Sequence, residues 1–164
     1  MHWSTLLLVA TLLILGPATC AAARAGKIVV SVDARDCFQG KAYQPQYLTV
    51  AIFDASKVEH LLRSADALRA ASNPTDAAGA GRMFGLRESL RAAIRQRSAL
   101  ARVNHSSRPA LRVSIPRIQR IAVFGFASGE GEEEGFASAI QDVAAHGPNR
   151  VTLFFSTPAE CGLR

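Results

Sequence analysis

The sequence predicts an α+β domain, in which a mixed β-sheet of about five strands carries a helical hairpin and a C-terminal βαβ unit. Three observations support this class. Runs rich in β-branched residues occur at both ends of the chain, and two stretches with helical spacing lie between them. The composition, with 49% apolar and 20% charged residues, excludes a disordered chain. We therefore expect residues 26–164 to form a single globular domain.

Two strands are expected before the helices. Residues 27–33 are rich in β-branched side chains, with Ile28, Val30 and Val32 on one face. Residues 47–53 are apolar on both faces, which is typical of a central strand.

The middle of the chain predicts the helical hairpin. Leu61, Leu62, Ala65 and Leu68 recur at helical spacing, which predicts a helix over residues 57–71. Residues 73–81 contain a proline and two glycines and break the pattern. A second helix is then expected over residues 82–103. Two helices with a short break between them can cover one face of a sheet.

The C-terminal third predicts the βαβ unit. Residues 111–115 alternate cleanly and residues 119–126 are mostly apolar, so both are expected to be strands. Three glutamates then precede an apolar period at Phe136, Ile140 and Val143, and Gly147-Pro148 would end the helix. Residues 150–156 follow as a strand, so residues 132–146 are interpreted as a crossover helix between parallel neighbours.

A β-sandwich with a helical insertion is the alternative fold. It would use the same strands, but it would treat residues 132–146 as a loop. The acidic first turn and the apolar spacing of that segment favour the α+β interpretation with a helix there.

The N-terminus predicts export. Residues 6–15 form an apolar run interrupted only by Thr11, too short to cross a bilayer, which needs about 20 apolar residues. Gly16-Pro17 and a cluster of alanines follow, as in a signal peptide. We expect residues 1–25 to be this signal, with cleavage between Cys20 and Gly26 and a periplasmic or secreted product. An uncleaved membrane anchor and a lipoprotein anchored at Cys20 are the alternatives. The excess of 16 arginines over 3 lysines, with 29 alanines, suggests a bacterial source.

Patterns of catalytic, metal-binding or cofactor-binding residues are lacking in the sequence. It contains no H-E-x-x-H, G-x-S-x-G, P-loop or C-x-x-C pattern. We therefore expect a non-catalytic binding or structural protein without cofactor or metal. The alternative is a small envelope enzyme with an unconventional site around residues 128–134, a glycine- and glutamate-rich turn.

Two cysteines remain after the expected cleavage, Cys37 and Cys161. In an oxidising compartment such a pair is most simply a disulfide. The alternative is that Cys37 works with a histidine as a catalytic dyad, but the sequence places no histidine near it.

Positive charge is concentrated in the middle of the chain. Residues 57–120 hold 13 basic and 4 acidic residues, whereas residues 121–164 hold 2 basic and 6 acidic residues. Arg87, Arg91, Arg95 and Arg102 are expected on one stripe of the second helix, with Arg97 closer to the core. This stripe is interpreted as a docking surface for an anionic envelope component or an acidic protein surface. The alternative is a solvated helix face. Nucleic acid is not expected, because no aromatic residues interleave with these arginines.

Overall fold

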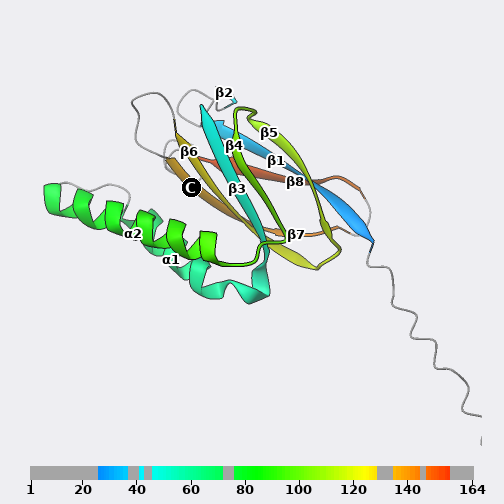
Figure 1. Cartoon of the computed structure of the whole chain (residues 1–164), viewed down its shortest axis with the longest axis horizontal. Helices are drawn as coiled ribbons and strands as arrows, with labels where there is room; N and C mark the ends of the chain where they lie inside the picture. The colour runs from blue at the N-terminus through cyan, green and yellow to red at the C-terminus, as the bar shows by residue number, and fades with distance from the viewer. Residues whose placement is uncertain are drawn as a thin grey trace, which may run out of the picture.

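The computed structural model describes residues 26–36, 41–42, 46–71, 76–128, 135–144 and 147–155. One β-sheet packs face to face on a second, and two helices cover the far side of the second sheet (Figure 1). The elements in chain order are β1 (Lys27–Asp36), β2 (Lys41–Ala42), β3 (Tyr47–Asp54), the short 3-10 helix η1 (Ala55–Lys57), α1 (Glu59–Ala70), α2 (Ala77–Gln96), β4 (Ala101–Ser106), β5 (Ala110–Pro116), β6 (Arg120–Ser128), β7 (Gly135–Asp142) and β8 (Asn149–Phe154).

The strands divide into two sheets, called sheet A and sheet B below. In sheet A, β5 pairs antiparallel with β1, β8 pairs with β1 in parallel, and the two-residue β2 pairs with the end of β1. Sheet B has the order β4-β3-β6-β7, and all of its neighbours are antiparallel. Sheet A is therefore mixed, as the sequence predicts, but the strands form two sheets rather than one, and sheet B is wholly antiparallel.

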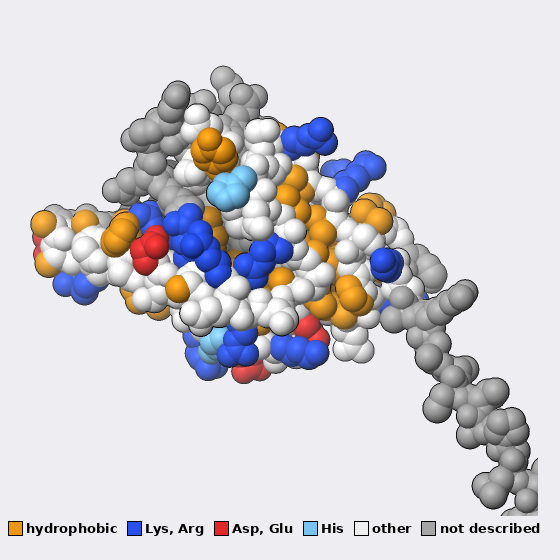
Figure 2. All heavy atoms as spheres, in the orientation of Figure 1, with side chains coloured by type: hydrophobic (Ala, Val, Ile, Leu, Met, Phe, Trp, Pro, Cys, Tyr) orange, Lys and Arg blue, Asp and Glu red, His pale blue; other side chains and the backbone are white. Residues whose placement is uncertain are grey.

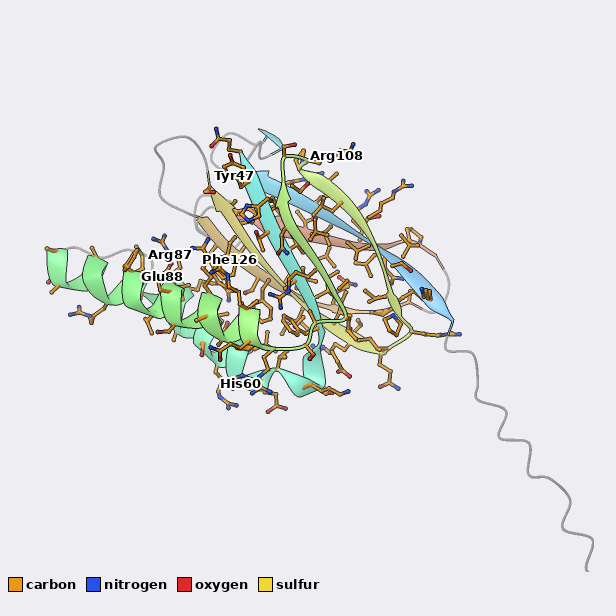
Figure 3. All side chains as sticks on the ribbon, in the orientation of Figure 1. Tyr47, His60, Arg87, Glu88, Arg108 and Phe126 are labelled. Carbon is orange, nitrogen blue, oxygen red and sulfur yellow. The ribbon has the colours of Figure 1, made fainter. Side chains whose placement is uncertain are left out.

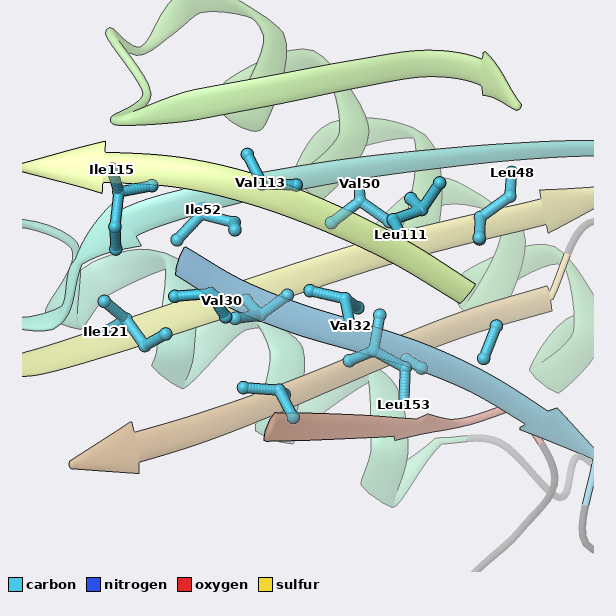
Figure 4. Close-up of a cluster of buried hydrophobic side chains, with 14 of the residues drawn as sticks. Val30, Val32, Leu48, Val50, Ile52, Leu111, Val113, Ile115, Ile121 and Leu153 are labelled. Atoms are coloured by element: carbon cyan, nitrogen blue, oxygen red, sulfur yellow. The ribbon is translucent and has the colours of Figure 1, made fainter. Parts of the chain in front are cut away.

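The main core lies between the two sheets (Figure 4). Side chains alternate along each strand, so every second residue of β1 and β3 points into this layer. Val30 and Val32 from β1 meet Leu48, Val50 and Ile52 from β3, and each of them is at most 1% exposed. Burial of each such side chain stabilises the fold by roughly 1.5–3 kcal/mol.

A second core lies between sheet B and the helices. Phe53 of β3 and Phe124 of β6 point away from sheet A, and their ring centroids are 5.8 Å apart. Leu61 of α1 and Leu90 and Ile94 of α2 pack against them. Sheet B is thus covered on both faces, which explains why β3 and β6 are apolar throughout.

Much of the predicted secondary structure is confirmed. The α+β class is confirmed, and so is the helical hairpin, because α1 and α2 contact each other on one face of a sheet. Strands occur where they are expected, at residues 27–33, 47–53, 111–115, 119–126 and 150–156, with small differences at their ends.

The prediction of a C-terminal βαβ unit is wrong. Residues 135–142 form strand β7, which pairs antiparallel with β6, and β8 lies in the other sheet beside β1. The apolar spacing of this segment does not distinguish a helix from a strand, because residues four apart, such as Phe136 and Ile140, share a face in both. Pairing with β6 decides the outcome, since β6 is buried on both faces and needs a partner at its second edge. Because the two sheets pack face to face, the layout is that of the alternative, a sandwich with a helical insertion, although residues 135–142 are a strand rather than a loop.

The second helix ends earlier than predicted. α2 stops at Gln96, and residues 101–106 form β4 at the edge of sheet B, where a helix was expected up to residue 103 and a loop over residues 104–109. The Leu100 amide N–H donates to the Ile52 carbonyl, which starts the pairing of this segment with β3. Arg97 is exposed rather than close to the core.

Two polar side chains fix the ends of strands. The Asp54 carboxylate accepts hydrogen bonds from the hydroxyl and the amide N–H of Ser56 at 2.7 and 3.1 Å, and these bonds lower the pKa of Asp54. The charged form therefore stabilises the turn, and this contribution is lost as the pH falls through the lowered pKa. Asn149, buried at the start of β8, bonds both backbone groups of Ala144 and closes the connection after β7.

Gly125 and Gly85 predict opposite effects of the same substitution. A Cβ at Gly125 would lie 2.7 Å from Cδ1 of the fully buried Leu153, whereas a Cβ at Gly85 on α2 would meet nothing within 4 Å. We expect Gly125→Ala to lower the free energy of unfolding by about 1–3 kcal/mol through overpacking. Gly85→Ala should raise it by about 1 kcal/mol through helix propensity. Urea unfolding of both variants measures this, and an equally stable Gly125→Ala protein would contradict the tight contact between the sheets.

Candidate functional site: an arginine-lined pocket

Three of the four predicted docking arginines line one pocket. Arg91 and Arg95 come from the last turns of α2, and Arg102 comes from β4. The four residues are therefore not on one helix, because Arg102 lies on a strand. Arg87, farther toward the start of α2, is outside the lining, and its guanidinium lies over the Phe84 ring at 5.5 Å.

This pocket, called the arginine pocket below, lies between α2 and the outer face of sheet B. Its volume is about 310 Å³, at the lower end of the range for ligand sites. Basic side chains flank a hollow on this face of the molecule (Figure 2). The lining residues other than the arginines are the apolar Ala51, Ile94, Phe124 and Phe126 and the polar Thr49, Asn104 and His105. Phe126 lies beside α2 (Figure 3), and its ring faces the Arg91 guanidinium.

Arg102 is held in place by the end of α2. Its Nη2 donates to the carbonyl oxygens of Ile94 at 2.9 Å and Arg97 at 3.1 Å. These carbonyls lie at the helix C-terminus, where a cation is favoured by the helix dipole. Within the described part of the chain, the Nε and Nη1 groups of Arg102 make no hydrogen bond, so they stay available to a ligand.

Arg91 and Arg95 differ in their surroundings. The Arg91 guanidinium lies 5.7 Å from the Phe126 ring centroid, and its Nη1 is 3.5 Å from Glu88 Oε1. Arg95 is exposed and has no hydrogen bond or ion pair with any residue that the structure describes. Arg95 therefore carries the charge that an incoming anion meets first.

A β-bulge brings two consecutive residues to the pocket. The register of β3 with β4 shifts between Leu48 and Val50, opposite Ser106 and Val103. The extra residue there is His105, whose φ of 52° lies in the left-handed region that non-glycine residues rarely adopt. In a regular strand Asn104 and His105 would point to opposite faces, whereas here both line the arginine pocket.

The electrostatics of the arginine pocket favour an anion. Among the residues that the structure describes, the lining has three arginines and no acidic residue. Glu88, which pairs with Arg91, is outside this lining. A concave site with one sign of charge concentrates its field and attracts the opposite charge.

Most of the other predicted site residues lie outside the part of the chain that the structure describes. Cys37, Cys161, residues 129–134 and the expected signal at residues 1–25 lie outside the described residues, and so does His146. Ser128, at the end of β6, is half-buried. His60 lies on α1, away from the arginine pocket (Figure 3).

Comparison with known proteins gives no match for this chain. The sequence matches no protein-family profile, and neither a curated protein nor a solved structure matches the chain. Across the described ranges, no cluster of three or more potential metal-ligating side chains occurs. None of the described helices is long and apolar enough to cross a membrane.

Thr49, Asn104 and His105 were missed by the sequence analysis. Thr49 lies in a strand expected to be buried on both faces, and residues 104–109 were expected to be loop. A bulge depends on the pairing of β4 with β3, so local sequence carries little signal for it.

Arg102 and Arg95 are expected to differ in their effect on stability. Arg102→Ala removes two charged hydrogen bonds to the end of α2 and should lower the free energy of unfolding by about 1–3 kcal/mol. Arg95→Ala removes no hydrogen bond or ion pair with a described residue and should change it by less than about 0.5 kcal/mol. Chemical denaturation followed by circular dichroism compares the two variants, and equal losses would contradict the assigned roles.

Proposed function

We propose that this chain is an exported, non-catalytic binding protein. Its arginine pocket would take an anionic group of an envelope component or of another protein's acidic surface. The observation that supports this most is the convergence of Arg91, Arg95 and Arg102, from two elements, on one concavity whose described lining residues include no carboxylate.

The chemistry of the lining supports binding rather than catalysis. Among the described residues that line the arginine pocket, no hydrogen bond joins a nucleophile to a base, as activation of a hydroxyl would require. The basic face is concave, whereas a flat or convex one was expected of a binding module, so the choice of binding over catalysis rests on the chemistry of the lining and not on its shape. A concave site accepts a single anionic group of a larger partner and orients it between fixed cations.

We also propose a Cys37–Cys161 disulfide, which depends on export because such a bond forms in an oxidising compartment. β1 and β8 are parallel neighbours, with Arg35 opposite Phe154, and the Phe155 amide N–H donates to the Arg35 carbonyl. The chain thus leaves both strands at the same end of sheet A. Cys37 is two residues beyond Arg35 and Cys161 six beyond Phe155. A six-residue segment can span up to about 20 Å, which supports a bridge between the two exits.

Binding is expected to depend on salt and on the arginines of the pocket. Dextran sulfate and phosphatidylglycerol vesicles are suitable polyanions for a first measurement by biolayer interferometry. At low salt the wild-type protein should bind at least one of them, and the affinity should fall steeply as the Debye length shrinks from about 10 Å at 0.1 M to about 3 Å at 1 M salt. The Arg91→Glu/Arg95→Glu variant should bind neither, because the charge of the pocket is reversed.

Arg112→Glu/Arg117→Glu is the matched control. It makes the same change in net charge at exposed residues of sheet A and the turn after it, away from the arginine pocket. This control should bind nearly as well as the wild-type protein. Equal losses in both double variants would show attraction by net charge alone, and salt-independent binding, or none at low salt, would contradict the proposal.

The mass of the exported protein tests localisation and the disulfide together. The expected product begins between Cys20 and Gly26 and is lighter by two hydrogens than its reduced form, since a bridge replaces two thiols. The bridge would close a loop of more than 100 residues, for which chain entropy gives a stabilisation of up to about 4.7 kcal/mol. Intact mass spectrometry before and after reduction decides this. Retention of Met1, or two free thiols in the exported fraction, would contradict it, and a lipid mass on Cys20 would indicate the lipoprotein form.

A further inference from the structure

We infer that the anion is the carboxylate of an acidic polysaccharide, and that Tyr47 with His105 forms a platform for the sugar ring beside the arginine pocket. This inference rests on the proposed function, because it names the ligand of the same pocket. It adds a second contact site, at the rim, which the arginines alone do not imply.

The polar lining of the arginine pocket suits a sugar better than a bare inorganic anion. A phosphate or sulfate ion would need only the guanidinium groups of Arg95 and Arg102. Thr49, Asn104 and His105 add a hydroxyl, an amide and an imidazole to the same lining. Such groups donate to and accept from hydroxyls, which a uronate ring carries next to its carboxylate.

The rim of the pocket carries an exposed aromatic ring. Tyr47, the first residue of β3, is 49% exposed. Its ring packs edge-to-face against His105, with the centroids 5.7 Å apart, and His105 lines the arginine pocket. Tyr47 lies at the start of β3, at the end of sheet B away from α1 (Figure 3). A large exposed ring beside a polar pocket is suited to a ligand with an apolar face, and a pyranose ring presents such a face of C–H groups.

The β-bulge ties this platform to the arginine pocket. Because His105 is the extra residue of β4, its ring reaches both the pocket and Tyr47. A left-handed residue that is not glycine costs roughly 1–2 kcal/mol. Such strain persists only where the surroundings enforce it, and it is found most often at binding sites. The bulge therefore aligns a charged subsite and a stacking subsite for consecutive units of a chain.

A membrane surface fits this site less well than a glycan. Arg91 and Arg102 are half-buried and line a hollow, so of the three pocket arginines a flat layer of headgroups would meet mainly the exposed Arg95. A polysaccharide can place one carboxylate in the hollow and its next ring on Tyr47. Charge complementarity and the neighbouring aromatic ring both favour this occupant.

The test uses α-1,4-linked tetragalacturonate and galacturonate monomer, titrated by calorimetry at low salt. Arg95→Glu should weaken binding of both sugars by roughly tenfold or more, because one charge is reversed. Tyr47→Ala should weaken tetramer binding by about tenfold, the order expected for one lost aromatic contact, and leave the monomer unchanged. Tyr47→Phe should bind like the wild-type protein. Phe154→Ala, at another exposed aromatic ring, on sheet A, is the matched control and should change neither affinity.

The outcomes separate this inference from the proposed function. If Arg95→Glu loses both sugars but Tyr47→Ala binds the tetramer normally, the platform is overturned and anion binding stands. Salt-sensitive binding of dextran sulfate or phosphatidylglycerol vesicles without binding of tetragalacturonate overturns the glycan assignment alone. If none of these probes binds the wild-type protein, both proposals fail. An unchanged melting temperature of Tyr47→Ala shows that its loss of affinity is not a loss of fold.

Discussion

The burial of sheet B on both faces is the constraint on which the rest of this structure depends. β6 is buried at seven consecutive positions, from Ile121 to Ala127, so neither of its faces can meet water. One face is covered by sheet A and the other by the helical hairpin. Each edge of β6 must also be paired, because buried backbone groups without hydrogen bonds cost free energy, and β3 and β7 supply these partners.

The position of the arginine pocket follows from this double coverage. The helices are inserted between β3 and β4, so the chain must return from the end of α2 to the edge of sheet B. This return brings Arg102 under the last turn of α2, where it bonds the Ile94 and Arg97 carbonyls. The guanidinium of Arg102 thus caps the C-terminus of α2 and is part of the pocket lining. Arg102 therefore both stabilises the end of α2 and lines the pocket, whereas Arg95 makes no hydrogen bond or ion pair with a described residue.

Most of the secondary structure could be predicted from the sequence, because the composition and apolar spacing of each element are visible within that element. The β-branched run of β1 and the apolar spacing of α1 each lie within one element and need no distant partner. β7 could not be predicted in this way, since Phe136 and Ile140 satisfy both periods and only pairing with β6 decides between them. The assignment of strands to two sheets likewise depends on contacts distant in sequence, such as that of β1 with β8.

The candidate site could also be predicted only in part from the sequence. The arginines could be selected from charge alone, because the excess of basic residues is visible in the sequence. Their convergence with Thr49, Asn104 and His105 could not, since it requires the end of α2, the return to β4 and the bulge opposite β3. Helical spacing alone does not show which arginines line the pocket. Arg87 shares the helix face of Arg91, but its guanidinium lies over Phe84 and it is not part of the lining.

A nuclear magnetic resonance titration tests the central claim, that the fold assembles an anion site between α2 and β4, most directly. The ¹⁵N-labelled protein is titrated with galacturonate at low salt while its backbone amides and arginine Nε–H groups are followed. The account predicts that the largest shifts occur at Asn104, His105 and the side chains of Arg95 and Arg102, with little change at Arg112 and Arg150 on sheet A. Shifts spread evenly over the exposed arginines, or centred on sheet A, would contradict it.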